Sequence, residues 1–129
     1  MRTATIICRL LVRVCGLIQI SLGLLFWTGN GLGLVPTHML SGLLLVLSFL
    51  TLAVLGAVAG LSKGRVALAI AWGILTVVLG VTQTGILPGS FHWIVQVIHL
   101  LVGIAAIAQA EALAAGILER RPTRQPAAR

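Results

Sequence analysis

The chain has 129 residues, of which 59% are hydrophobic and only 9% are charged, and its formal net charge is +7. A soluble globular domain needs a charged surface that this composition does not provide, and an intrinsically disordered chain would contain far fewer apolar residues. The composition is instead typical of an integral membrane protein.

Four apolar stretches long enough to cross a bilayer as helices follow one another along the chain. They cover residues 4–28, 36–61, 66–84 and 90–118. Pro36 suits the first turn of the second helix, and Ser90 is expected to be the N-cap of the fourth. The predicted fold class is all-α: a four-transmembrane-helix bundle that forms a single domain over residues 1–118. A basic, disordered tail is expected over residues 119–129.

The basic residues fall on one side of this four-span arrangement. They lie near the N-terminus, in the loop between the second and third spans and in the C-terminal tail: Arg2, Arg9, Arg13, Lys63, Arg65, Arg120, Arg121, Arg124 and Arg129. By the positive-inside rule, both termini and the middle loop are predicted to be cytoplasmic. We therefore interpret the net positive charge as a signal of topology and of attraction to the lipid bilayer, and not of nucleic-acid binding.

The first pair of predicted helices is similar in sequence to the second pair. "LGLLFWTG" at residues 22–29 matches "LGVTQTG" at residues 79–85, and the motif H-x-L-x-G begins at both His38 and His99. These short matches suggest an internal two-fold repeat of helix pairs. In that repeat His38 and His99 take corresponding positions.

One face of the fourth predicted helix combines polar and small residues. His92, Gln96, His99 and Gly103 share this face, and Ala106 and Ala110 continue it. Small residues allow close approach of helices in a bilayer, so this face is predicted to lie at a helix–helix contact. Its polar residues would then point into the bundle.

The three histidines differ in their expected depth. A histidine near a helix end commonly lies at the membrane surface, and this is the more frequent role for residues such as His38 and His92. His99 lies about 10 Å further into the bilayer than His92. An ionisable residue at that depth indicates a functional site.

Two imidazoles on facing helices at a similar depth are the arrangement that axial ligation of a haem iron requires. We expect His38 and His99 to be the ligands, and His92 is the alternative ligand on the fourth helix. Gly42 and Gly103 lie four residues beyond the two favoured histidines. A glycine there would leave room for a flat macrocycle.

On these residues the chain resembles the membrane-embedded b-type cytochromes, four-helix proteins of the bacterial inner membrane that hold haem between helices through paired histidines. The resemblance rests on the helix count, the topology and the two H-x-L-x-G motifs. It implies binding of one haem b and a role in electron transfer, with a quinone or a redox protein as partner. It also implies a multi-pass location in the cell membrane. The outer loops depart from the family because they carry no basic residue to pair with haem propionates.

Other functions are compatible with the same sequence. A cofactor-free accessory or scaffolding subunit of a larger membrane complex, or of a homo-oligomer, is the main alternative. The three histidines together could bind zinc or copper, but no carboxylate or thiol is expected on their side of the membrane. The chain has no phosphate-binding loop, no nucleophile beside a base and no paired carboxylates, so an electron carrier or accessory subunit is favoured over an enzyme.

Three further features carry predictions about packing. Glu111 is expected to form an ion pair with Arg13 or Arg9 across the bundle. The segment "GAVAG" at residues 56–60 has the spacing of a GxxxG contact for another helix or subunit. Trp72 is interpreted as an anchor at the inner membrane interface.

Overall fold

The computed structural model describes residues 1–120, and these residues form four long helices with short turns between them. The long helices are α1 (Arg2–Trp27), α2 (Val35–Val58), α3 (Lys63–Thr82) and α4 (His92–Glu119). Single 3-10 turns precede α2 at Leu32–Leu34 and follow α3 at Gln83–Gly85. No strand occurs in this part of the chain, so the all-α prediction is confirmed. Residues 121–129, most of the predicted tail, lie outside the described residues.

Each long helix is long and apolar enough to cross a membrane. Pro36 lies in the first turn of α2, as predicted. Ser90, in contrast, is not the N-cap of α4: the cap is Phe91, and it makes no side-chain hydrogen bond. The reason is the turn that precedes the helix, in which Gly89 has a φ of 94° and its carbonyl accepts a hydrogen bond from the backbone N–H of His92.

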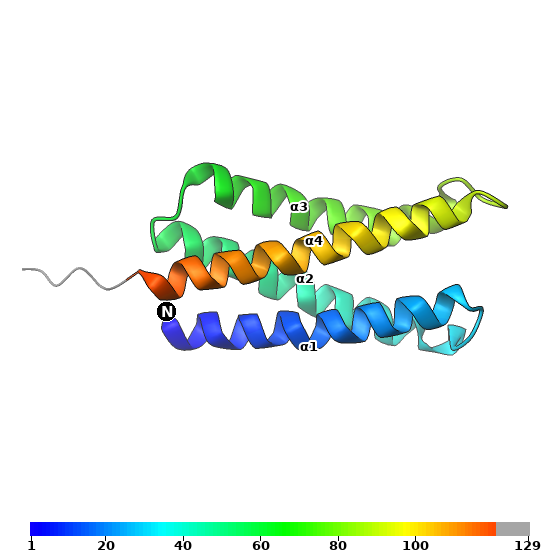
Figure 1. The fold of residues 1–129 in the computed structure, drawn as a ribbon, viewed down its shortest axis with the longest axis horizontal. Helices are drawn as coiled ribbons and strands as arrows, with labels where there is room; N and C mark the ends of the chain where they lie inside the picture. Colours follow the sequence, from blue (N-terminus) through cyan, green and yellow to red (C-terminus); the bar gives the residue numbers. More distant parts are fainter. Residues whose placement is uncertain (121–129) are drawn as a thin grey trace, which may run out of the picture.

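The helices form two antiparallel hairpins, α1–α2 and α3–α4, that pack side by side with α2 also contacting α4 (Figure 1). The largest buried cluster contains residues of all four helices, among them Val12 of α1, Phe49 and Leu52 of α2, Ala69 of α3, and Ala106, Ala110 and Leu113 of α4. It lies in the half of the bundle that contains the N-terminus. Toward the opposite end the two hairpins diverge (Figure 1). We call that opposite end, where residues 28–34 and 83–91 connect the helices, the loop end.

The prediction that the small residues of α4 lie at a helix–helix contact is confirmed in part. Ala106 and Ala110 are fully buried at the contact with α2, so the expected close approach is confirmed there. It is wrong at Gly103, which is only partly buried and would have no atom within 4 Å of an added Cβ. The inward face of α4 passes through Val102 instead.

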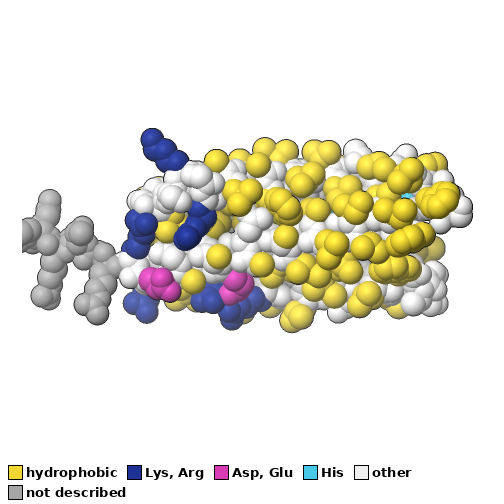
Figure 2. Space-filling model, turned by 45° about the horizontal axis from the view of Figure 1, so that its top comes forward, with side chains coloured by type: hydrophobic (Ala, Val, Ile, Leu, Met, Phe, Trp, Pro, Cys, Tyr) yellow, Lys and Arg dark blue, Asp and Glu magenta, His cyan; other side chains and the backbone are white. Residues whose placement is uncertain are grey.

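Charged side chains gather at the end of the bundle that holds the N-terminus, and hydrophobic side chains cover the rest of the face seen in Figure 2. Arg2, Lys63, Arg65 and Arg120 all lie at or near helix ends on this side. At the end of α4, Arg120 donates a hydrogen bond of 2.9 Å from Nη1 to the carbonyl of Ala59, which follows α2. This bond fastens the end of α4 to the end of α2, because the last carbonyls of a helix lack partners within it.

The packing gives the GxxxG segment and Trp72 contacts inside the bundle. Gly56 is packed beneath Leu61 and Leu113, so this glycine contacts another helix, α4, whereas Gly60 lies beyond α2 with a φ of 77°. Trp72 has a partner on a neighbouring helix. Its indole N–H donates to the backbone carbonyl of Val102 over 3.0 Å and so links α3 to α4.

Candidate functional site

His38 and His99 both lie on helix faces that line the bundle, in the half toward the loop end. His38 is in the first turns of α2, two turns before the buried Leu45, and His99 lies on α4 between the buried residues Val95 and Val102. Each histidine is itself partly buried. Both histidines are therefore partly buried residues in the same half of the bundle.

Each imidazole lies against a glycine of the preceding helix in its hairpin. A Cβ added to Gly23 on α1 would be 4.0 Å from Cε1 of His38, and one added to Gly80 on α3 would be 3.6 Å from Cε1 of His99. These glycines take the same place in the two similar segments "LGLLFWTG" and "LGVTQTG". The glycine–histidine contact thus repeats between the two hairpins. Sequence reasoning noticed the repeat but gave these two glycines no role.

The glycines of the H-x-L-x-G motifs have different surroundings from the ones expected. The space beside Gly42 is filled by the amide of Gln19, which would be 3.1 Å from an added Cβ. That amide donates hydrogen bonds to Ser41 Oγ, at 2.8 Å, and to the backbone carbonyl of His38. Because Gly42 has no side chain, the Gln19 amide has room beside it, and the hydrogen bonds of this amide hold the start of α2 against α1. Gly103 borders open space.

The Nδ1 atoms of His38 and His99 are buried and have no hydrogen-bond partner among residues 1–120. A neutral imidazole carries one donor and one acceptor, and a buried polar group left unpaired costs about 1–3 kcal/mol. Phe26 packs edge-on against the His38 ring, with the ring centroids 5.4 Å apart. Buried ring nitrogens without a partner are uncommon in folded proteins, so these two histidines form the candidate functional site.

His92 is placed differently. Its Nδ1 lies 3.2 Å from the backbone carbonyl of Ile86, so its ring joins the start of α4 to the turn after α3. Within residues 1–120, no group of three or more histidine, cysteine, aspartate or glutamate side chains is placed to hold a metal ion. The structure therefore does not favour the three-histidine zinc or copper site.

A cluster of opposite charges joins α1 to α4 in the other half of the bundle. Arg13 donates to both carboxylate oxygens of Glu111, at 2.7 and 2.8 Å, and Arg9 donates to the same carboxylate at 2.8 Å. The predicted ion pair is confirmed and involves both arginines. Because such charge-assisted bonds are among the strongest in proteins, this cluster fixes α1 against α4 away from the histidines.

The fold and the site together define a class: a bundle of four helices, each long and apolar enough to cross a membrane, with a buried histidine pair toward one end. No protein-family model matches the chain, and no curated protein and no solved structure matches it significantly. The assignment of function rests on the geometry described above.

Proposed function

We propose that the chain is a multi-pass protein of the bacterial inner membrane that binds one haem b through His38 and His99 and transfers electrons within the membrane. The observation that carries the proposal is that His38 on α2 and His99 on α4 each have a buried Nδ1 atom without a partner among residues 1–120. Neutral imidazole is a common haem ligand, and one ring nitrogen from each histidine would fill the two axial positions of the iron.

The residues around the two histidines suit a flat apolar group. Gly23 and Gly80 place no side chain against the rings, and Phe26 gives the ring of His38 an apolar neighbour. The polar ends of a haem would have to be held by uncharged groups near the loop end, such as Asn30 and Thr37, or by water. A haem with both axial positions filled by protein supplies one-electron transfer and leaves no open position for oxygen chemistry.

The charge distribution supports the orientation in the membrane. The described basic residues lie in the half of the bundle that holds the N-terminus, and the segments at the loop end carry none. Under the positive-inside rule both termini are cytoplasmic and the histidines lie toward the outer side. The electron partner would be a quinone in the bilayer or a redox protein.

The test is spectroscopic. We expect the protein purified with haem supplied to show the reduced-minus-oxidised bands of a b-type cytochrome, and we expect His38→Ala and His99→Ala to lose them. His92→Ala is the matched control, because His92 has its own partner at Ile86, and it should keep the bands. Absence of haem bands in the parent protein would overturn the proposal. Loss in His92→Ala with retention in His99→Ala would move the ligand to His92.

A cofactor-free accessory subunit is the second candidate, and the surface of α3 favours it. Only Ala69 and Gly73 are buried among the residues of α3, so most of this apolar helix is free to pack against another membrane protein or a second copy. In this case the parent protein would show no haem bands and would co-purify with a larger complex or as an oligomer.

A further inference from the structure

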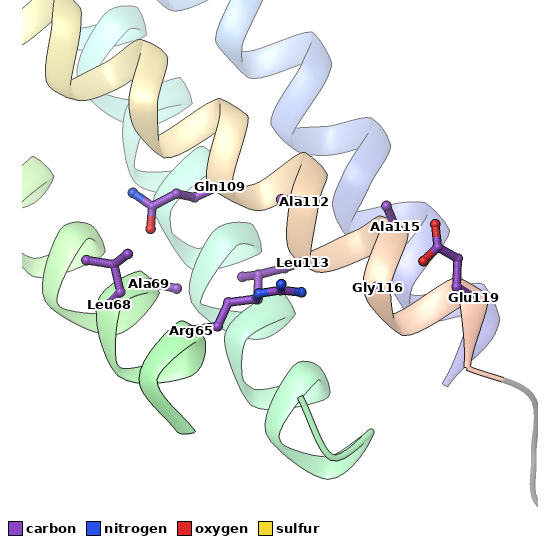
Figure 3. Close-up of a pocket in the computed structure, with 9 residues that line it drawn as sticks. All are labelled: Arg65, Leu68, Ala69, Gln109, Ala112, Leu113, Ala115, Gly116 and Glu119. Atoms are coloured by element: carbon purple, nitrogen blue, oxygen red, sulfur yellow. The ribbon is translucent and has the colours of Figure 1, made fainter. Parts of the chain in front are cut away.

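A groove runs between α3 and α4 at the end of the bundle opposite the histidines. It has a volume of about 320 Å³ and apolar walls that include Leu68, Ala69 and Ala112. Arg65 extends from the first turn of α3 across the groove toward Gly116 (Figure 3). A Cβ on Gly116 would be 3.4 Å from Nη1 of Arg65, so this glycine leaves the space that the guanidinium occupies.

The charge of Arg65 is not neutralised within the described residues. Arg65 forms no ion pair there, whereas the cluster of Arg9, Arg13 and Glu111 does. Glu119 also lines the groove, but among the described residues its carboxylate forms no ion pair with the guanidinium of Arg65. An arginine at the edge of an apolar groove therefore presents five donors to an anion.

A second groove, between α1 and α4 near the middle of both helices, provides an internal comparison. It is lined by apolar residues and by Arg13, with a volume of about 290 Å³. Its arginine is bonded to both carboxylate oxygens of Glu111. The two grooves are thus similar in size, but only the one beside α3 has an arginine that is free to bind an anion.

We infer that the groove between α3 and α4 binds an anionic phospholipid of the surrounding bilayer. The phosphate would be bound by Arg65, and an acyl chain would lie along Leu68 and Ala112. Gln109, which faces the groove beside Leu68 (Figure 3) and precedes Gly116 by two turns of α4, would donate to an ester carbonyl. Basic pockets between membrane helices on the cytoplasmic side are suited to such headgroups. The inference uses only the membrane location from the proposed function and is independent of haem.

The experiment measures lipid binding to the delipidated protein in detergent by native mass spectrometry. Phosphatidylglycerol and phosphatidylcholine with identical acyl chains are compared, and we expect phosphatidylglycerol to bind about tenfold more tightly because it pairs with an unneutralised guanidinium. Arg65→Ala should reduce its affinity to that of phosphatidylcholine. Lys63→Ala is the matched control: it removes the same charge from the same helical turn but does not line the groove, so the preference should remain.

Three further variants test the shape and the charge of the site. Ala112→Phe fills the groove without changing its charge and should weaken phosphatidylglycerol binding, whereas Ala108→Phe, one turn deeper and outside the lining, should not. Glu119→Gln removes a negative charge that lines the groove and should strengthen binding. The helical circular dichroism of each variant, and any haem spectrum, should be unchanged because the histidines lie toward the other end.

Three outcomes would overturn the inference. Equal losses in Arg65→Ala and Lys63→Ala would mean that the basic end attracts anionic lipid without a site. Unchanged binding in Arg65→Ala would mean that the lipid binds elsewhere. Glycerol phosphate binding as tightly as phosphatidylglycerol would identify a site for free phosphate groups and not for a bilayer lipid.

Discussion

The positions of His38 and His99 depend on two glycines that leave room for the imidazole rings. Gly23 and Gly80 let each imidazole pack directly against the preceding helix of its hairpin. A side chain longer than that of alanine at either glycine would compete with the ring for space, because an added Cβ would already be in van der Waals contact with Cε1. The positions of the two candidate ligands therefore depend on residues that carry no chemistry themselves.

This dependence gives a prediction for Gly80. Gly80→Leu should displace the His99 ring and abolish the haem bands expected of the parent protein, because the branched side chain has to enter the space next to Cε1. Gly80→Ala should keep them, since a Cβ at 3.6 Å from Cε1 is in ordinary van der Waals contact. Visible spectra of both variants check this. Haem bands of equal strength in the two variants would show that the contact does not position His99.

The three histidines also differ in their hydrogen bonds. His92 contacts a backbone carbonyl of the neighbouring turn, whereas His38 and His99 have buried Nδ1 atoms without a partner among residues 1–120. Burying an unpaired polar group is costly, so native proteins rarely retain one without a ligand, a water or a function. This contrast is the reason for favouring His99 over His92.

At the scale of elements, α2 and α4 meet through closely packed residues of the main buried cluster. Ala106 and Ala110 allow α4 to approach the large side chains Phe49 and Leu52 of α2. Because lipid chains are as apolar as a protein core, helices in a membrane associate mainly through such close packing and through hydrogen bonds between helices. The indole of Trp72, bonded to the carbonyl of Val102, adds a bond of that kind between α3 and α4.

The packing predicts opposite effects for two neighbouring residues of α4. Ala106→Leu should destabilise the bundle by about 1–3 kcal/mol, because the contact with α2 has no free space. Gly103→Ala should be tolerated or stabilising by up to about 1 kcal/mol, because a Cβ there meets nothing within 4 Å and alanine favours helix. Unfolding in mixed detergent micelles, followed by circular dichroism, measures both. Similar destabilisation by the two changes would contradict the observed rotation of α4.

At the scale of the whole molecule, the charged groups and the histidine pair occupy opposite halves of the bundle. Figure 2 shows lysine, arginine and acidic side chains gathered on the side of the N-terminus. In the proposed orientation, the lipid site at Arg65 would face the cytoplasmic leaflet and the histidine pair would lie toward the outer one. A bound haem would then be accessible to partners on the outer side.

The proposed orientation is tested by reporter fusions. A reporter placed after residue 129 should be active on the cytoplasmic side, and one inserted within residues 29–34 should be active on the opposite side, because the basic residues fall on one side of the spans. Activity of both reporters on the same side would contradict the four-span topology. A C-terminal reporter on the outer side would reverse the orientation.

The sequence by itself determined the features that depend on composition and on charge. The number of helices follows from four long apolar stretches, and the gathering of basic residues at one end follows from their positions along the chain. The partnership of Glu111 with Arg9 and Arg13 was also predictable, because a carboxylate within an apolar helix needs a cation from a neighbouring helix. These inferences need no knowledge of how the helices are rotated.

Only the tertiary structure decided which side chains meet. The contacts of Gly23 and Gly80 with the histidines, the amide of Gln19 beside Gly42, and the groove at Arg65 all depend on the rotation and offset of one helix against another. Sequence periodicity reveals such a rotation in soluble proteins, where one helix face is polar. In a helix that is apolar on every side the buried and lipid-facing residues look alike, so the pattern could not exclude Gly103 from the inward face of α4.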